Sequence, residues 1–286
     1  MSISRRTALK GILTGSATAA IGSTRASALA VARPDAVALL YDATLCIGCK
    51  TCMVACNEAN GLPPDTAGRP GALYHEPVDL SARAKTVIKL YSQDGAQSFV
   101  KAQCMHCLDP ACASACMLGA LKKDEFGVVS YDADLCVGCR YCEVACPFNV
   151  PKFEWSKAAP KIVKCELCKE RLAAGRQPAC TEVCPRKAVV FGPRRDLLNE
   201  AHRRVAASPD RYVPKVYGEM EAGGTQALYL SAVPFEKLGL PALGPEVAPG
   251  LARTIQHGVY KGFIAPVALY GALAAVIWRN RHDDTR

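Results

Sequence analysis

Cysteine is the residue type whose spacing in this chain points to chemistry, because its sixteen copies stand in four groups of four. The first and third groups have the spacing Cys-x2-Cys-x2-Cys-x3-Cys, and the second and fourth lengthen the middle spacer to four and eleven residues. Thiolates in such runs are ligands of [4Fe–4S] clusters, in which the cysteine after the three-residue spacer reaches a second cluster. At four ligands per cluster, the sequence predicts four [4Fe–4S] clusters with no cysteine left over. The groups are Cys46, Cys49, Cys52, Cys56; Cys104, Cys107, Cys112, Cys116; Cys136, Cys139, Cys142, Cys146; and Cys165, Cys168, Cys180, Cys184.

Disulfides and zinc are the two other uses of sixteen cysteines to be weighed. Disulfide frameworks belong mainly to short secreted domains without a core, and bridging does not require four copies of one spacing. Zinc sites usually pair two separate Cys-x2-Cys elements, whereas each group here is a run of three cysteines plus a fourth. Both alternatives fit the pattern less well than clusters do.

An internal repeat indicates how the groups are organised. The segment Tyr41–Cys49 recurs as Tyr131–Cys139, and eleven of the sixteen residues that end at Cys56 and Cys146 are identical. The second and fourth groups share a Pro-Ala-Cys sequence, so two types of group alternate along the chain. Each pair of types can form one ferredoxin-like unit with two clusters. We therefore predict an α+β, loop-rich fold with two such units.

The groups also predict the local elements that hold them. Glycine at Gly48 and Gly138 lets the backbone approach a cluster and direct its N–H groups at sulfur. Short strands are expected before the first and third groups, at 38–41 and 128–131. Short helices are expected at 53–60 and 143–146.

The N-terminus resembles an export signal. Residues 1–30 contain four basic and no acidic residues, and Ser4–Lys10 resembles a twin-arginine signal, except that Ala8 stands where phenylalanine is usual. An Ala-x-Ala site at 28–30 predicts cleavage before Val31. The twin-arginine route exports folded proteins, which suits clusters assembled in a reducing cytoplasm.

The C-terminus predicts a membrane anchor. Gly262–Trp278 contains no charged residue and is bounded by Lys261 and Arg279. Seventeen residues are at the short limit for a spanning helix, about 17–25 residues. We expect one transmembrane helix over 257–279 with a cytoplasmic tail at 280–286; a buried helix that packs on a partner is the alternative.

The positive charge of the chain does not indicate nucleic-acid binding. The formal net charge is +9, and the four signal-peptide bases account for part of it. An oxidised cluster with four thiolates contributes about −2, so the mature holoprotein has a net charge of about −3. Five cations next to the groups are expected to offset cluster charge, and no nucleic-acid module is recognisable. They are Lys50, Arg140, Lys101, Lys161 and Lys164.

The sequence shows no catalytic set. His106 lies between two cysteines of the second group, and because no cysteine is replaced, we expect it beside a cluster or at the surface. His257, just before the uncharged stretch, is expected at an interface or in solvent; contact with a haem or quinone site in a partner is the alternative. The chain is therefore predicted to transfer electrons and not to be an enzyme itself.

Several segments together resemble the four-cluster electron-transfer subunits of the molybdopterin oxidoreductase and hydrogenase families, and most closely the iron–sulfur subunits of periplasmic hydrogenase-2-type nickel–iron hydrogenases. Met117 departs from the usual cysteine–proline ending. The resemblance rests on Lys101–Cys107, Cys139–Lys152, Lys164–Cys168, Val213–Glu219, Gly223–Gln226 and Ile255–His257.

The resemblance implies a nested pairing of the cysteine groups. The spacing alone is equally compatible with a sequential pairing, of the first group with the second and the third with the fourth. It implies an outer unit from 31–95 and 160–235, an inner unit at 96–159 and a linker at 236–256. The implied ligand sets are Cys46, Cys49, Cys52, Cys184 for cluster 1; Cys56, Cys165, Cys168, Cys180 for cluster 2; Cys104, Cys107, Cys112, Cys146 for cluster 3; and Cys116, Cys136, Cys139, Cys142 for cluster 4.

The function implied by the resemblance is an electron conduit at the periplasmic face of the inner membrane. Its expected partners are the small and large subunits of a hydrogenase, an integral-membrane quinone-reactive subunit and membrane lipid. A molybdopterin oxidoreductase of the formate dehydrogenase or polysulfide reductase type is the alternative catalytic partner. A membrane-anchored assembly or scaffold protein with structural clusters is the alternative of another class.

Overall fold

The computed structural model describes residues 36–63, 77–93, 95–249 and 264–283. Within them, short strands and helices are joined by long loops, as the sequence predicts. The strands are β1 Val37–Asp42, β2 Val87–Gln93, β3 Ala96–Ala102, β4 Leu121–Lys123, β5 Val129–Tyr131, β6 Lys152–Phe153, β7 Ile162–Val163, β8 Val189–Pro193 and β9 Ala227–Leu230. The helices are α2 Thr51–Ala59, α3 Ala111–Ser114, α4 Tyr141–Ala145, α5 Lys169–Ala173, α6 Ala179–Glu182, α7 Arg194–Ala207, the 3-10 turn η1 Glu221–Gly223 and α9 Ile264–Asp283.

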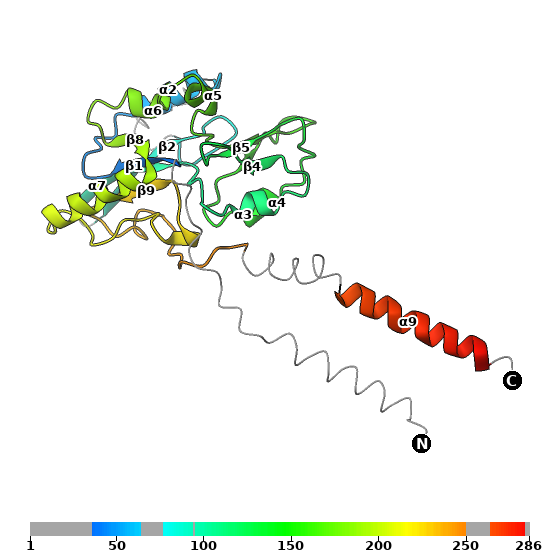
Figure 1. Ribbon diagram of the computed structural model, residues 1–286. Coiled ribbons are helices and arrows are strands. Elements are labelled where there is room, and N and C mark those ends of the chain that lie inside the picture. The colour runs from blue at the N-terminus through cyan, green and yellow to red at the C-terminus, as the bar shows by residue number, and fades with distance from the viewer. Residues whose placement is uncertain (1–35, 64–76, 94, 250–263, 284–286) are drawn as a thin grey trace.

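A three-stranded sheet in the order β8-β1-β9 organises the larger lobe. β1 runs antiparallel to β8 and parallel to β9. Figure 1 shows α7 on one side of this sheet and α2, α5 and α6 on the other. Because side chains alternate across a strand, Ala38 and Leu40 of β1 pack towards α7, while Leu39 and Tyr41 enter the main core on the other side. The strand is therefore hydrophobic on both faces.

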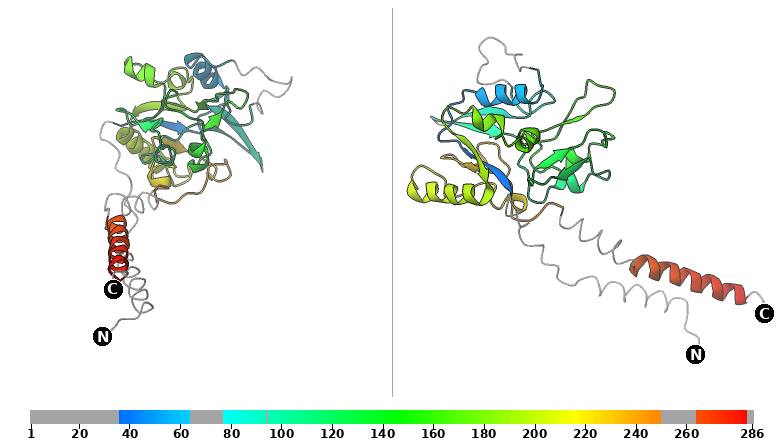
Figure 2. Two further views of the ribbon diagram at one scale, coloured as in Figure 1. Left: turned by 90° about the vertical axis from the view of Figure 1, so that its right-hand side faces the viewer. Right: turned by 45° about the horizontal axis from the view of Figure 1, so that its top comes forward.

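A smaller lobe lies beside this sheet and contains α3, α4, β4 and β5 (Figures 1 and 2). The hairpins β4–β5 and β6–β7 pack on a separate small core that includes Leu121, Val129, Phe153 and Ile162. The hairpins β2–β3 and β6–β7 each cross a boundary that the sequence suggested between the units, at 95/96 and 159/160. The backbone of the two lobes is thus joined through paired strands.

The expected strands and helices around the cysteine groups are present. β1 and β5 match the strands expected at 38–41 and 128–131, and α2 matches the helix expected at 53–60. The helix expected at 143–146 is α4 and lies earlier, at Tyr141–Ala145, since Arg140 with a φ of 65° precedes its first turn.

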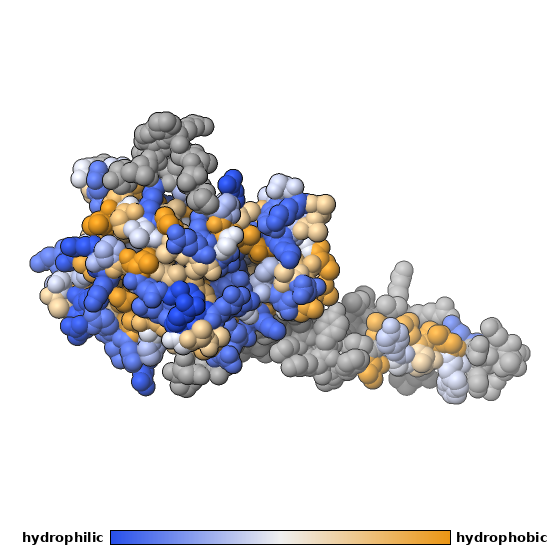
Figure 3. Space-filling model, turned by 90° about the horizontal axis from the view of Figure 1, so that it is seen from above, coloured by the Kyte–Doolittle hydropathy of each residue, from blue (hydrophilic) through white to orange (hydrophobic). Residues whose placement is uncertain are grey.

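α9 stands apart from the two lobes and presents mostly hydrophobic side chains (Figure 3). Leu269, Tyr270 and Trp278 are each at least 60% exposed. The helix continues to Asp283, four residues past the expected end of the anchor at 279. Among the described residues, no helix combines the length and apolarity that crossing a membrane requires. The predicted signal at 1–30, His257 and the start of the predicted anchor lie outside the described residues.

Candidate iron–sulfur cluster sites

Four cysteines from distant segments of the sequence line one cavity in the larger lobe. They are Cys46, Cys49, Cys52 and Cys184. The sheet explains why residues so distant in sequence meet. Because β1 is antiparallel to β8, with Tyr41 opposite Val189, the loop after β1 and the loop before β8 lie at the same end of the sheet. A backbone hydrogen bond of 2.7 Å from Asp42 to Ala188 closes this end.

A second cavity in the larger lobe is lined by Cys56, Cys165, Cys168 and Cys180. Cys56 is in α2 and Cys180 is in α6, and these two helices pack on each other. Burial raises the pKa of the Cys56 thiol above its usual value, and the neighbouring thiolate charge of Cys165 raises it further. The two cavities therefore share the α2 segment, which supplies cysteines to both.

The other eight cysteines belong to the second and third groups. Four line a third cavity, namely Cys116, Cys136, Cys139 and Cys142. β4 and β5 bring them together, because Leu121 pairs with Tyr131 and the preceding and following loops meet at that end.

The remaining four cysteines are Cys104, Cys107, Cys112 and Cys146. Burial raises the pKa of the Cys107 thiol well above its usual value, and the charges of Cys104, Cys146 and Cys112 raise it further. These four thiols therefore lie near one another. α3 carries Cys112 and packs against α4, which ends at Cys146.

The loops fit a sulfur-rich group because their backbone turns N–H groups toward sulfur. The Gly48 N–H donates to Cys46 Sγ at 3.5 Å, and the Ala188 N–H donates to Cys184 Sγ at 3.2 Å. Gly48 and Gly138 have φ values of +69° and +72°, a region that favours glycine. Among the described residues, no set of three or more His, Cys, Asp or Glu side chains is arranged to hold a single metal ion. The thiols instead surround cavities, which suits a cluster of several atoms.

Of the five cations expected to offset cluster charge, two are buried. Lys101 is fully buried and lines both cavities of the larger lobe. Lys164 is 2% exposed and donates to the carbonyl oxygens of Val129 and Cys165. Two others line cysteine cavities without being buried. Lys50 is half-buried beside Cys46, and Arg140 lies beside Cys139 with its guanidinium carbon 4.1 Å from the ring centroid of Trp155. Lys161 is exposed.

The sequence left two positions open for His106, beside a cluster or at the surface. The structure shows it buried beside the cysteines. It is 1% exposed, and its Nδ1 accepts a hydrogen bond of 3.1 Å from the Val129 N–H. Burial holds the pKa of the His106 imidazole well below its usual value, so the ring is neutral. Its Nε2 then bears the hydrogen and has no partner in the described part of the chain.

Gln103 is a candidate residue that the sequence analysis did not single out. Its side chain is 3% exposed, lines the cavity of Cys56 and Cys180, and has an unpartnered Nε2. A glutamine before a cysteine gives no pattern that distinguishes it from a surface residue, so no sequence signal could have found it.

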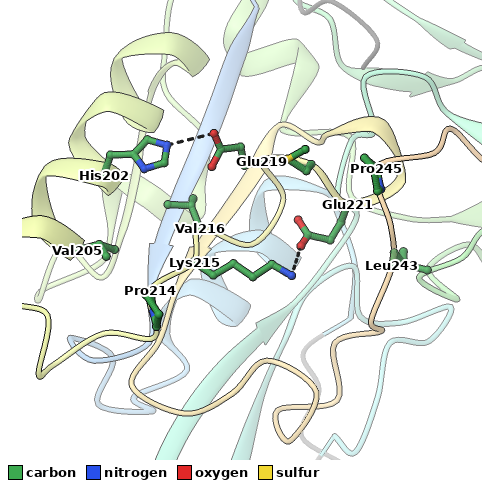
Figure 4. A pocket seen from close by; sticks show the side chains of 10 residues that line it. His202, Val205, Pro214, Lys215, Val216, Glu219, Glu221, Leu243 and Pro245 are labelled. Atoms are coloured by element: carbon green, nitrogen blue, oxygen red, sulfur yellow. Dashed lines mark hydrogen bonds and ion pairs between the residues drawn. The ribbon is translucent and has the colours of Figure 1, made fainter. Parts of the chain in front are cut away.

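A further cavity, of about 370 Å³, lies between α7 and the loops around 214–221 and 243–245 (Figure 4). No cysteine lines it. Its charged side chains are paired: His202 Nε2 lies 3.2 Å from Glu219 Oε1, and Lys215 Nζ lies 2.6 Å from Glu221 Oε1. It is therefore separate from the cysteine cavities.

Comparison with known proteins agrees with this geometry. Residues 96–194 match a family model described as a 4Fe-4S dicluster domain. The chain is 38% identical to the hydrogenase-2 operon protein HybA of Escherichia coli O157:H7, over 88% of this chain and 87% of that protein. It is 36% identical to the nitrate-inducible formate dehydrogenase iron–sulfur subunit of Escherichia coli K12, over 83% and 81% of the two chains. The chain belongs to this family of iron–sulfur proteins. A formate dehydrogenase iron–sulfur subunit of Haemophilus influenzae is 35% identical over 84% of this chain and 78% of its own.

Membership of the family confirms two predictions from the sequence. The resemblance to hydrogenase-2 and formate dehydrogenase iron–sulfur proteins is confirmed, and so is the presence of multiple [4Fe–4S] clusters. The chain is an iron–sulfur electron-transfer subunit of the type found in these oxidoreductases.

Proposed function

We propose that the chain holds four [4Fe–4S] clusters in the nested ligand sets given above. Three observed cavities support the first, second and fourth sets, since each is lined by all four of its cysteines. The third set is supported by the packing of Cys107 and Cys146 on the core cluster that contains Cys104, and by the contact of α3, which carries Cys112, with α4, which ends at Cys146. The outer unit at 31–95 and 160–235 would then hold two clusters, each with one cysteine from α2, and the inner unit at 96–159 the other two.

The four sets follow one another through the molecule. The cavities of sets 1 and 2 share Lys101 in their linings. Cys165 of set 2 and Cys104 of set 3 belong to the same core cluster. Cys112 of set 3 and Cys142 of set 4 lie on α3 and α4, which pack on each other. Neighbouring sets are thus close in the order 1, 2, 3, 4.

This arrangement suits an electron conduit. Clusters supply one-electron transfer when bound, and the chain's part is to fix their spacing, exclude water and set local charge. Cys49 in set 1 and Cys139 in set 4 are the exposed cysteines. The two ends of the series are therefore open to partners, while sets 2 and 3 are enclosed.

The catalytic partner that we propose is a periplasmic nickel–iron hydrogenase, with an integral-membrane quinone-reactive subunit at the other end. Support comes from the 38% identity to a hydrogenase-2 operon protein across most of both chains. Similar coverage of formate dehydrogenase iron–sulfur subunits keeps a molybdopterin oxidoreductase as the second candidate partner.

Export and anchoring complete the proposal. We place the chain at the periplasmic face of the inner membrane, exported by the twin-arginine signal at 1–30 and anchored by residues 257–279. The exposed apolar side chains of α9, which include Val267, Leu269, Leu273 and Ile277, support contact with lipid or with a membrane subunit.

Anaerobic purification of the full chain from its membrane tests the function. We expect about sixteen iron atoms per chain, at four per cluster, co-purification of hydrogenase subunits, and cluster reduction by hydrogen. Reduction by formate and not by hydrogen would assign the second candidate partner. Clusters that neither donor nor dithionite reduces would favour the scaffold alternative.

Serine substitutions test the ligand sets. Cys184→Ser and Cys46→Ser are expected to lose or shift the same EPR signal, because both thiols line one cavity. Cys136→Ser is the matched control in the smaller lobe. If Cys184→Ser resembled Cys136→Ser instead, the sequential pairing of the groups would replace the nested one.

A further inference from the structure

A buried hydrogen-bond donor faces the second cysteine cavity without an acceptor. Nε2 of Gln103 is one of two buried side-chain nitrogens that lack a partner among the described residues. The side chain lines the same cavity as Cys56, Cys165, Cys168 and Cys180. An unpaired buried donor costs about 1–3 kcal/mol, so an acceptor is expected in this cavity.

Lys101 fixes which end of the Gln103 amide faces the cavity. The Lys101 ammonium can only donate, and it lies 2.7 Å from Gln103 Oε1. The carbonyl end of the amide must therefore face Lys101, which leaves the NH2 end for another acceptor. The Tyr229 hydroxyl also lies beside Gln103 and donates its hydrogen to the carbonyl oxygen of Lys101 at 2.8 Å. Its oxygen can still accept one hydrogen from the Gln103 amide, but the NH2 group has two, so at least one remains for the cavity.

Lys101 is itself a buried charge without a carboxylate partner. It is fully buried, its other hydrogen bond goes to the Thr86 hydroxyl, and the ion pairs formed by the described residues do not include it. A buried charge is costly unless it is compensated. Lys101 lines both cysteine cavities of the larger lobe, so the cysteine ligands and the clusters that they would hold are the negative charges that compensate it.

We infer that Lys101 and Gln103 form a polar bridge between the two clusters of the outer unit, in which Lys101 is the shared counter-charge and Gln103 donates a hydrogen bond to sulfur in the cluster of Cys56. This rests on the ligand sets proposed above. When one cluster passes an electron to the other, the first loses one negative charge and the second gains one, and no proton moves. A fixed cation between them favours the reduced form of both, whereas the Gln103 hydrogen bond favours the reduced form of one.

EPR-monitored redox titration of the full-length holoprotein, with dithionite as the reductant, measures this difference. Lys101→Met keeps the length of the side chain and removes its charge. It is expected to shift two signals to lower potential, each by about tenfold in the reduction equilibrium, or about 59 mV for one electron. Gln103→Leu is expected to shift one of those two signals by about threefold, or about 28 mV. Lys122→Met, at an exposed lysine of β4, is the matched control and should shift none.

Iron content accompanies each titration and separates tuning from loss of a cluster. If Lys101→Met fails to load its clusters, Gln103→Leu decides, because it removes no charge. Unchanged potentials in fully loaded Gln103→Leu would overturn the hydrogen bond to the cluster. A shift of the same size in Tyr229→Phe would also overturn the hydrogen bond from Gln103 to the cluster, because the effect of the amide on the potential would then depend on Tyr229.

The identity of the shifted signals tests the assignment to a particular cluster. The signal shifted in Gln103→Leu must be the one that Cys56→Ser loses, and a shift in any other signal would overturn the bridge as described. Failure of the ligand sets would appear separately, as different signals lost in Cys46→Ser and Cys184→Ser. The choice of catalytic partner does not affect these measurements.

Discussion

Two glycines at equivalent positions of the internal repeat differ in what surrounds them, and this difference predicts unequal effects of one substitution. Gly48 and Gly138 both have a positive φ, +69° and +72°. An alanine at either position pays the same backbone strain, about 1–2 kcal/mol. At Gly48, however, a Cβ would lie 2.7 Å from Cδ1 of Phe99 and closer still to two further ring atoms. At Gly138 the nearest atom is the Pro160 carbonyl oxygen, 4.0 Å away.

The contact with Phe99 sets the size of the expected difference. Overpacking of a buried site usually costs about 1–3 kcal/mol, and Phe99 packs against the main core. Gly48→Ala should therefore be less stable than Gly138→Ala by about 1–3 kcal/mol, which is about 5- to 150-fold in an equilibrium constant. Because the Gly48 N–H also donates to Cys46 Sγ, the cluster of that loop should be the first to be lost.

The assay compares cluster retention in the two holoproteins. Each is incubated anaerobically in increasing denaturant, and bound iron and the individual EPR signals are followed. We expect Gly48→Ala to release its cluster at lower denaturant than Gly138→Ala, and Phe99→Leu in the Gly48→Ala background to restore much of the loss. Equal behaviour of the two alanine variants, or no rescue by Phe99→Leu, would refute the role of the ring.

Three further predictions concern the core, export and the membrane. Asp42→Asn should destabilise the protein by about 1.5–3 kcal/mol in denaturant unfolding followed by circular dichroism, since its fully buried carboxylate accepts three side-chain hydrogen bonds. Asp132 occupies the same position in the second copy of the repeat and lies in a half-buried turn, so Asp132→Asn should change stability by less than about 0.5 kcal/mol. Equal losses of stability in the two variants would contradict this account. Arg5→Lys with Arg6→Lys should leave cluster-loaded precursor in the cytoplasm on cell fractionation, and unchanged export would reject the signal. Deletion from Lys261 onward should release loaded protein from membranes, and persistent resistance to carbonate would mean that another contact holds it.

The cysteine spacing predicts the kind of cofactor but not which groups share a cluster. Cofactor type follows from local geometry, because three thiols two residues apart can face one cubane. Sharing depends on strand pairing between distant segments, as between Tyr41 of β1 and Val189 of β8. No local pattern near Cys46 or Cys184 encodes that register, so both the nested and the sequential pairing were compatible with the spacing.

The positions of the cations next to the cysteine groups indicated a role in offsetting cluster charge, but not which of them are buried, and β3 shows the physical reason. Phe99 and Lys101 are two residues apart on this strand and therefore share a face. Phe99 on that face lies against the Gly48 loop, so Lys101 is directed at the same cysteine-rich interior. Strand periodicity by itself usually places a lysine on the solvent side, so the prediction that Lys101 offsets cluster charge rested on its position next to the second cysteine group. Lys101 lies inside because cysteines line both cavities that it contacts, and the negative charge of their thiolates stabilises a buried cation there.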